Sequence, residues 1–335
     1  MSSSKQHDRS YKRLFSNPVI LRQLLETCVD EPWVSELDFS SLEYLSTEHV
    51  DKRLIASQND MLFQIRFADS PALLLVILEF QSTPDRFMAL RVLNYLCTVY
   101  KSYLKKNKNK KNKTIKTLPP VFPIVLYNGA DPWPSPLQIS DLIDIPEESG
   151  KMRSLRAYIP SFKYLCIDAK HYNEEILEEK QSLVSSLFLL EKNWEEGVES
   201  RTKQSAEYIA KHLKKEENKE ATHDLIDYIV FRLNLERMEG NRILAGEFST
   251  AEEISKMIED GLERMKQRER KIGIEIGEER GIQIGEERGI QIGEERGEHE
   301  QKVKTAKKLL AKGYPPGEVA EIVELDEEEI RKLLH

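Results

Sequence analysis

At 335 residues, the chain exceeds the usual length of one domain, so we expect a principal domain with an accessory region. A hydrophobic fraction of 39% is sufficient for a core. The mean hydropathy of −0.53 and the lack of an apolar run of ~20 residues argue against a membrane partner. The N-terminus has no apolar signal core and the cysteines are widely separated, so we expect a cytoplasmic protein without a disulfide framework.

The formal net charge of −8 hides one strongly basic segment. Residues 101–116, "KSYLKKNKNKKNKTIK", contain eight lysines and no acid, and we call them the lysine arm. One interpretation is a DNA-contacting arm, with Lys105, Lys106, Lys110 and Lys111 on the phosphates. The other is a solvated loop, which is what most Lys/Asn runs are.

The first half of the chain indicates alternating helices and strands. A helical spacing of apolar residues predicts a helix over 5–30, whereas 31–59 shows no single pattern. "DMLFQIRF" (60–67) alternates as a half-buried strand does. After the turn residues "ADSP", the run "ALLLVILEFQ" (72–81) predicts a central strand that is covered on both faces. The two strands should form a hairpin.

An amphipathic helix should follow over residues 83–106, because Pro84 suits a first turn and the apolar residues recur at helical spacing. Two further short strands are expected in "LPPVFPIVLYNG" (118–129) and "FKYLCIDA" (162–169). The order helix, hairpin, helix, strand, strand predicts an α/β domain that ends near residue 170.

A two-residue turn at Asp69-Ser70 would place Asp60 directly opposite Glu79. Opposed side chains have Cβ atoms ~4.5–5.5 Å apart, so two carboxylates there repel unless a cation or a shared proton lies between them. Hard oxygen ligands suit Mg²⁺ or another divalent cation. Gln81 should project from the same face, whereas a register slip of one residue would separate the two acids.

A purely structural interpretation of the same residues is also open. Asp60 would then cap the start of a strand, and Glu79 would pair with a cation such as Arg66 or Arg91.

Four sequence blocks, in order, resemble the Rpn family of recombination-promoting nucleases, also described as YhgA-like putative transposases. The blocks are "HDRSYKRLF", "NDMLFQIRF", "ILEFQS" and "FPIVLYNG". This family belongs to the PD-(D/E)XK nuclease superfamily. The resemblance implies a restriction-endonuclease-like α/β core over residues 1–170, with a mixed sheet flanked by helices.

The resemblance also implies roles for individual residues. Asp60 and Glu79 would be the catalytic acids and metal ligands, and Asp8 a supporting acid. Gln81 stands where the superfamily has Lys, and an amide can orient groups by hydrogen bonds but carries no charge. The implied chemistry is Mg²⁺-dependent hydrolysis of DNA phosphodiester bonds.

The rest of the chain is expected to be helical. Residues 171–270 are predicted to be an accessory region, 271–300 to hold three octads of the form "GIQIGEER", and 301–335 to form three short helices similar to a helix-turn-helix. The octads are either a self-associating helix or a spacer. Because acids begin the last helix, we favour oligomerisation or packing over DNA reading for the tail.

Two functions from different classes are consistent with these features. The first is a metal-dependent DNA endonuclease that promotes recombination and forms homo-oligomers through its C-terminal region. The second is a catalytically weak or inactive DNA-binding and oligomerising protein of mobile-element origin. The missing Lys at position 81 favours the second, and the retained pair Asp60 and Glu79 favours the first.

Overall fold

The computed structural model describes most of the chain and divides it into two compact units, Met1–Met265 and Lys266–His335. The described residues are 10–45, 60–70, 72–108, 115–144, 152–196, 198–235 and 250–333.

The first unit is built on a mixed five-stranded sheet with the order β1-β2-β3-β4-β5. β1, β2 and β3 pair antiparallel, whereas β4 and β5 continue the sheet in parallel. The strands are β1 (Leu37–Leu45), β2 (Asp60–Phe67), β3 (Leu73–Gln81), β4 (Val121–Tyr127) and β5 (Leu165–Asp168). The predicted α/β class and the four predicted strands are confirmed, and β1 is an edge strand that the sequence did not indicate.

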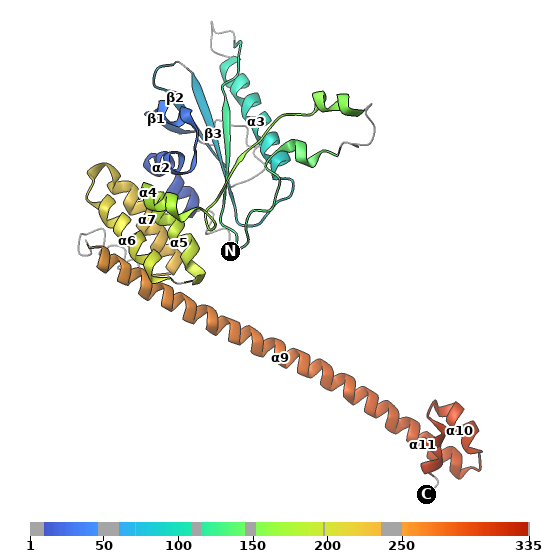
Figure 1. Cartoon of the computed structure of the whole chain (residues 1–335). Coiled ribbons are helices and arrows are strands. Elements are labelled where there is room, and N and C mark those ends of the chain that lie inside the picture. Colours follow the sequence, from blue (N-terminus) through green and yellow to red (C-terminus); the bar gives the residue numbers. More distant parts are fainter. Residues whose placement is uncertain are drawn as a thin grey trace. The chain divides into compact units, whose positions relative to one another are not determined.

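Helices cover both faces of the sheet (Figure 1). On one face of the sheet, α3 packs against the strands. The other face packs against the N-terminal helical residues and the helices that follow β5. The helices of this unit are α2 (Pro18–Cys28), α3 (Met88–Lys108), α4 (Glu174–Lys180), α5 (Leu183–Glu196), α6 (Glu199–Leu213) and α7 (Lys219–Leu233). Short 3-10 helices lie at Pro32–Glu36, Ile139–Leu142, Met152–Tyr158 and Glu216–Asn218. This two-sided cover explains why β3 is apolar at successive positions.

The single helix predicted over residues 5–30 is wrong, because the chain breaks at Asn17. Residues 10–15 are helical, and α2 begins afresh at Pro18. The Asn17 side chain accepts a hydrogen bond from the Val19 backbone N–H at 3.0 Å, and Pro18 needs no backbone partner at the first helical position.

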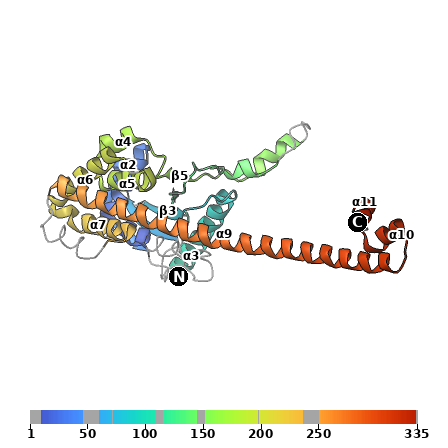
Figure 2. The same ribbon diagram turned by 90° about the horizontal axis from the view of Figure 1, so that it is seen from below.

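The helices after residue 170 share one apolar core with the sheet. Leu187 and Phe188 of α5 and Ile229 of α7 are buried in the same cluster as Val76 and Leu78 of β3. The first turns of α9 (Ala251–Ala311) join this core through Ile254, Met257, Ile258 and Leu262. Figure 2 shows these turns beside α6 and α7.

The second unit contains most of α9 and two short helices, α10 (Pro316–Val323) and α11 (Glu327–Lys332). Ala306, Val319, Val323 and Ile330 form its small core. The octads and the first predicted tail helix are therefore one continuous helix. Asp326 caps α11 by accepting a hydrogen bond from the Glu328 backbone N–H at 2.8 Å.

The octads are exposed along their whole length. Seven isoleucines between Ile272 and Ile292 have exposed fractions of 45–63%, and a Cβ on any glycine from Gly273 to Gly297 would meet nothing within 4 Å. Within the described ranges, no helix combines the length and the apolar character needed to cross a bilayer.

Truncation after Arg270 should leave the first unit folded, because the residues of α9 that are buried in the core of this unit end at Leu262. Truncation after Thr250 is the matched comparison, since it removes four buried side chains from the core. Each is expected to contribute about 1.5–3 kcal/mol to stability. Chemical denaturation should show a cooperative transition for the longer fragment and a strongly weakened one for the shorter. Aggregation of the longer fragment would contradict the boundary.

Candidate active site

The β2–β3 hairpin pairs Asp60 with Glu79, in the register that a turn at Asp69-Ser70 predicts. The alternation of the two strands is consistent with this register. Leu62, Leu75 and Ile77 pack towards α3, whereas Met61, Phe63 and Phe80 belong to the core on the opposite face. Asp60 and Glu79 therefore occupy opposed positions on the α3 face. The side chain of Asp60 and the whole of Asp8 lie outside the described residues.

Glu79 is a buried carboxylate, with 5% of its surface exposed. Its Oε1 accepts hydrogen bonds from the Arg91 Nη2 and, at 2.6 Å, from the Gln81 Nε2. Arg91 also donates through Nη1 to the Asp85 Oδ2 at 3.2 Å. Of the two cations that the sequence offered as partners, Arg91 contacts Glu79, and Arg66 lies at the other end of β2, opposite Leu73.

Burial raises the pKa of the Glu79 carboxyl, while Arg91, Gln81 and the charge of Lys12 act to lower it. Desolvation disfavours the charged form of a carboxyl group, so this site gains from any further positive charge. Burial also raises the pKa of Tyr95, and the negative charge of Glu79 adds to that effect. Nearby positive charge therefore stabilises the ionised form of the buried Glu79 carboxyl group.

The oxygen atoms of Glu79 and Gln81 are ligands of the kind that a hard divalent cation accepts. Both hydrogen bonds to Glu79 use Oε1, and among the described residues no donor reaches Oε2. Gln81 offers a second oxygen, because its amide nitrogen is the atom that faces Glu79. Carboxylate and amide oxygens suit Mg²⁺. Among the described residues, no three or more His, Cys, Asp or Glu side chains lie close enough together to hold a metal ion.

The end of β4 lies beside Gln81 in the sheet. Tyr127 pairs with Gln81 in the parallel register and is 1% exposed. Its hydroxyl donates to the Asp131 carbonyl at 2.9 Å, and its ring packs against Trp133 with the centroids 4.9 Å apart. The Asn128 N–H donates to the Gln81 carbonyl at 3.1 Å. This loop holds the backbone of Gln81 in place.

On the opposite face of β3, aromatic contacts hold the strand in place. Phe80 follows Glu79 and precedes Gln81 in the sequence. Its ring packs against Tyr11 and Phe15, with centroid distances of 5.8 Å and 5.6 Å. Tyr11 in turn contacts Tyr228 of α7. The helices after residue 170 therefore reach the strand that carries the candidate acids.

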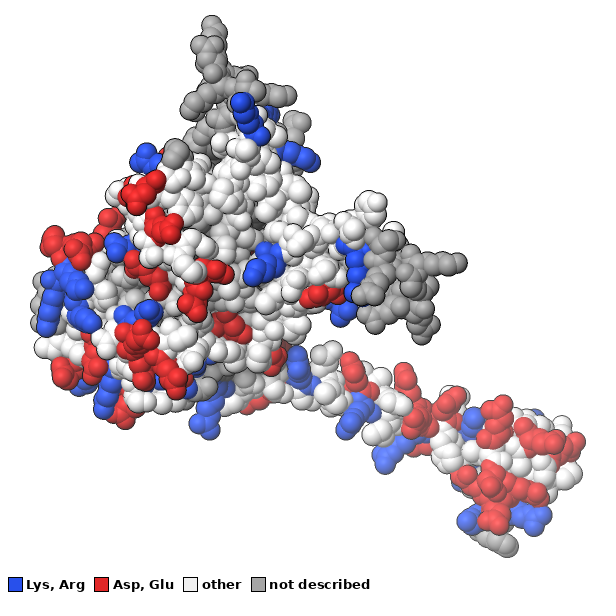
Figure 3. Space-filling view, turned by 45° about the horizontal axis from the view of Figure 1, so that its top comes forward, with Lys and Arg blue, Asp and Glu red and all other residues white. Residues whose placement is uncertain are grey.

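The lysine arm is only partly described. Lys101 and Lys105 are exposed on the last turns of α3, whereas the Lys106 side chain, Lys110 and Lys111 lie outside the described residues. In Figure 3, basic side chains gather at the top of the view, and acidic and basic side chains are interspersed over the helical part of the described face.

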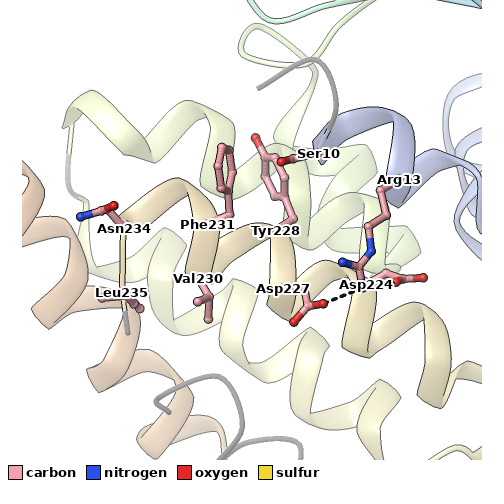
Figure 4. A pocket seen from close by; sticks show the side chains of 9 residues that line it. All are labelled: Ser10, Arg13, Asp224, Asp227, Tyr228, Val230, Phe231, Asn234 and Leu235. Atoms are coloured by element: carbon pink, nitrogen blue, oxygen red, sulfur yellow. Dashed lines mark hydrogen bonds and ion pairs between the residues drawn. The ribbon is translucent and has the colours of Figure 1, made fainter. Parts of the chain in front are cut away.

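Two cavities elsewhere are not lined by Glu79 or Gln81. The first, of about 310 Å³, lies between the N-terminal helical residues and α7. Figure 4 shows Arg13 directed towards Asp227, with an ion pair of 2.7 Å. The second, of about 640 Å³, lies between α6 and the start of α9.

Comparison with known proteins identifies the family. The family described as "Putative transposase, YhgA-like" matches residues 5–221, which include the sheet and the helices α2–α6. The chain belongs to this family. The match extends beyond β5, in agreement with the core that the helices after residue 170 share with the sheet. No solved structure matches the chain, so the PD-(D/E)XK assignment remains an inference from sequence.

Curated relatives of this YhgA-like chain include nucleases and inactive proteins. The recombination-promoting nuclease RpnD of Escherichia coli O157:H7 is 26% identical over 152 residues, 45% of this chain and 56% of RpnD. RpnC of E. coli K12 is 27% identical over 43% of this chain and 46% of RpnC. The inactive nuclease-like protein RpnE of the same strain is 25% identical over 44% and 47%. The matched segments span about half the length of these relatives.

Gly129 should be intolerant of a side chain. A Cβ at this position would overlap the Tyr127 hydroxyl, so Gly129→Ala should displace the Tyr127 ring and lower the free energy of unfolding by about 1–3 kcal/mol. Gly273→Ala is the matched control, because its Cβ would meet nothing within 4 Å and alanine favours a helix. Equal unfolding midpoints for Gly129→Ala and the wild type in chemical denaturation would contradict the packing of Tyr127.

Proposed function

We propose that this YhgA-like chain is a metal-dependent DNA endonuclease that hydrolyses phosphodiester bonds and promotes recombination. The observation that carries the proposal is the pairing of Asp60 with Glu79 at the end of a buried hairpin. Family membership supports it, because relatives that share this region are named recombination-promoting nucleases.

Asp60 and Glu79 would hold Mg²⁺ or another divalent cation. When bound, such a cation supplies positive charge to the scissile phosphate and makes water a better nucleophile. Gln81 positions the Glu79 carboxylate through its amide N–H. Burial of Glu79 beneath α3 excludes water from one side of the carboxylate and strengthens its attraction to a cation. Asp8 is a supporting acid in this proposal.

The lysine arm would hold the DNA backbone. Lys105, Lys106, Lys110 and Lys111 are the proposed phosphate contacts, and the exposure of Lys101 and Lys105 supports this role. Contacts of this kind strengthen binding to all sequences alike and make it dependent on salt.

The octads would associate with a second copy of the chain. Each of the seven glycines destabilises the helix by about 1 kcal/mol relative to alanine. The exposed isoleucines are not buried in a single helix in water, so they do not stabilise it. The absence of side chains at the glycines permits close approach of a partner helix. The full chain should therefore sediment as an oligomer, and the fragment ending at Arg270 should not.

A catalytically weak DNA-binding protein is the alternative. The inactive relative RpnE matches 44% of the chain, which is close to the 43–45% matched by the relatives named nucleases, RpnC and RpnD. Gln81 in place of the superfamily's Lys and the ion pair between Arg91 and Glu79 both favour this alternative.

Asp60→Ala should abolish Mg²⁺-dependent nicking of plasmid DNA. DNA binding should be unchanged or slightly tighter, because a negative charge near the phosphates is removed. Asp69→Ala, which removes an exposed acid from the turn of the same hairpin, should nick normally. Nicking that persists in purified Asp60→Ala protein would show that Asp60 is not a catalytic acid.

Replacing Lys105, Lys106, Lys110 and Lys111 with Gln should weaken binding to every duplex. Each lost phosphate contact should reduce the slope of log K against log salt by roughly 0.9. The matched control replaces four exposed lysines of the α6–α7 region with Gln, namely Lys211, Lys214, Lys215 and Lys219. Fluorescence anisotropy at several salt concentrations measures both slopes. Equal slopes for the two variants would indicate that the arm is a solvated loop.

A further inference from the structure

Arg91 contacts the candidate site although it belongs to no recognised block of the sequence. It projects from the start of α3 and donates to the same Glu79 oxygen as Gln81 does. Position 81 lacks the positive charge that a Lys would bring there. The guanidinium of Arg91 therefore delivers a full positive charge to the place where the motif has none.

The surroundings of Arg91 differ on its two sides. The side chain of Glu79 is 6% exposed, whereas those of Arg91 and Asp85 are 39% and 33% exposed. The guanidinium thus spans from a buried carboxylate to a solvent-accessible one. Arginine presents several N–H donors in a fixed fork, which suits phosphate oxygens as well as carboxylates.

We propose that Arg91 is a phosphate-binding residue that competes with a divalent cation for Glu79 and is released towards DNA when Glu79 is neutralised. This inference rests on the proposed function of the same site. A cation on Glu79 repels the guanidinium, and the Asp85 carboxylate, 3.2 Å from Nη1, keeps it at the mouth of the site. Arg91 then occupies the role of the absent Lys without sharing its position.

The competition is measurable without catalysis. Isothermal titration of Mn²⁺ into the full chain should show roughly fivefold tighter binding by Arg91→Gln than by the wild type, because a partly exposed ion pair no longer has to be broken. Arg91→Lys retains the charge and should bind Mn²⁺ as the wild type does. Arg86→Gln removes a neighbouring exposed arginine and is the matched control.

These titrations separate the inference from the proposed function. Equal or weaker Mn²⁺ binding by folded Arg91→Gln would overturn the inference alone. No binding by any variant would remove both the metal site and the inference. Thermal melting verifies that each variant is folded, and Arg91→Lys carries the test if Arg91→Gln is not: weaker Mn²⁺ binding by Arg91→Lys would then identify Arg91 as a structural partner of Glu79.

The release of Arg91 is tested by a double-mutant cycle without metal. Arg91→Gln should hardly change the affinity for duplex DNA in the wild-type background, where the guanidinium is held by Glu79. In the Glu79→Gln background, the same substitution should weaken binding roughly fivefold, a typical loss for one charged contact. Equal effects of Arg91→Gln in the two backgrounds would overturn the release of Arg91.

Discussion

The burial of β3 on both faces is the constraint on which the rest of the first unit depends. Seven successive residues from Leu74 to Phe80 are buried, so the strand can exist only between two helical layers. Glu79 lies within this run, and its carboxylate is desolvated by the same packing that stabilises the sheet. The fold thereby creates a demand for compensation of the Glu79 charge, which Arg91 and Lys12 meet with positive charge and Gln81 meets with a hydrogen bond.

The two faces of β3 differ at its end: one carries aromatic packing and the other carries the polar side chains of the candidate site. On one face Phe80 packs against Tyr11, which contacts Tyr228, and the Tyr228 hydroxyl donates to the buried Glu191 carboxylate at 2.5 Å. On the other face lie Glu79 and Gln81. Phe80 lies between these two residues in sequence, so the aromatic cluster anchors the backbone that carries both polar side chains. The helices after residue 170 therefore belong physically to the support of the site.

Local patterns predicted the features that depend on neighbours in sequence. Alternation in β2, the apolar run in β3 and a short turn were sufficient for the register that pairs Asp60 with Glu79. Arg91 as the actual partner of Glu79 could be proposed only as one of two cations, because the choice depends on how α3 lies across the sheet. β1 was missed because its polar residues and the bulge between Asp38 and Glu43 interrupt the alternation of a strand. The aromatic contacts that link Phe80 to α7 join Tyr11 to residues 69 and 217 positions away, and no periodicity encodes them.

The Gln at position 81 changes what the rest of the site must supply. In a site with a Lys at this position, the same strand brings the positive charge directly beside the acids. Here the amide of Gln81 can only orient Glu79, so the charge has to come from another element. Arg91 reaches the same oxygen from a helix, and its second contact, to Asp85, fixes the direction of approach. In the proposed mechanism, a guanidinium held by two carboxylates exchanges one of them for a phosphate without leaving the site. The departure from the motif therefore moves the positive charge from β3 to α3, while Asp60 and Glu79 still pair across the hairpin.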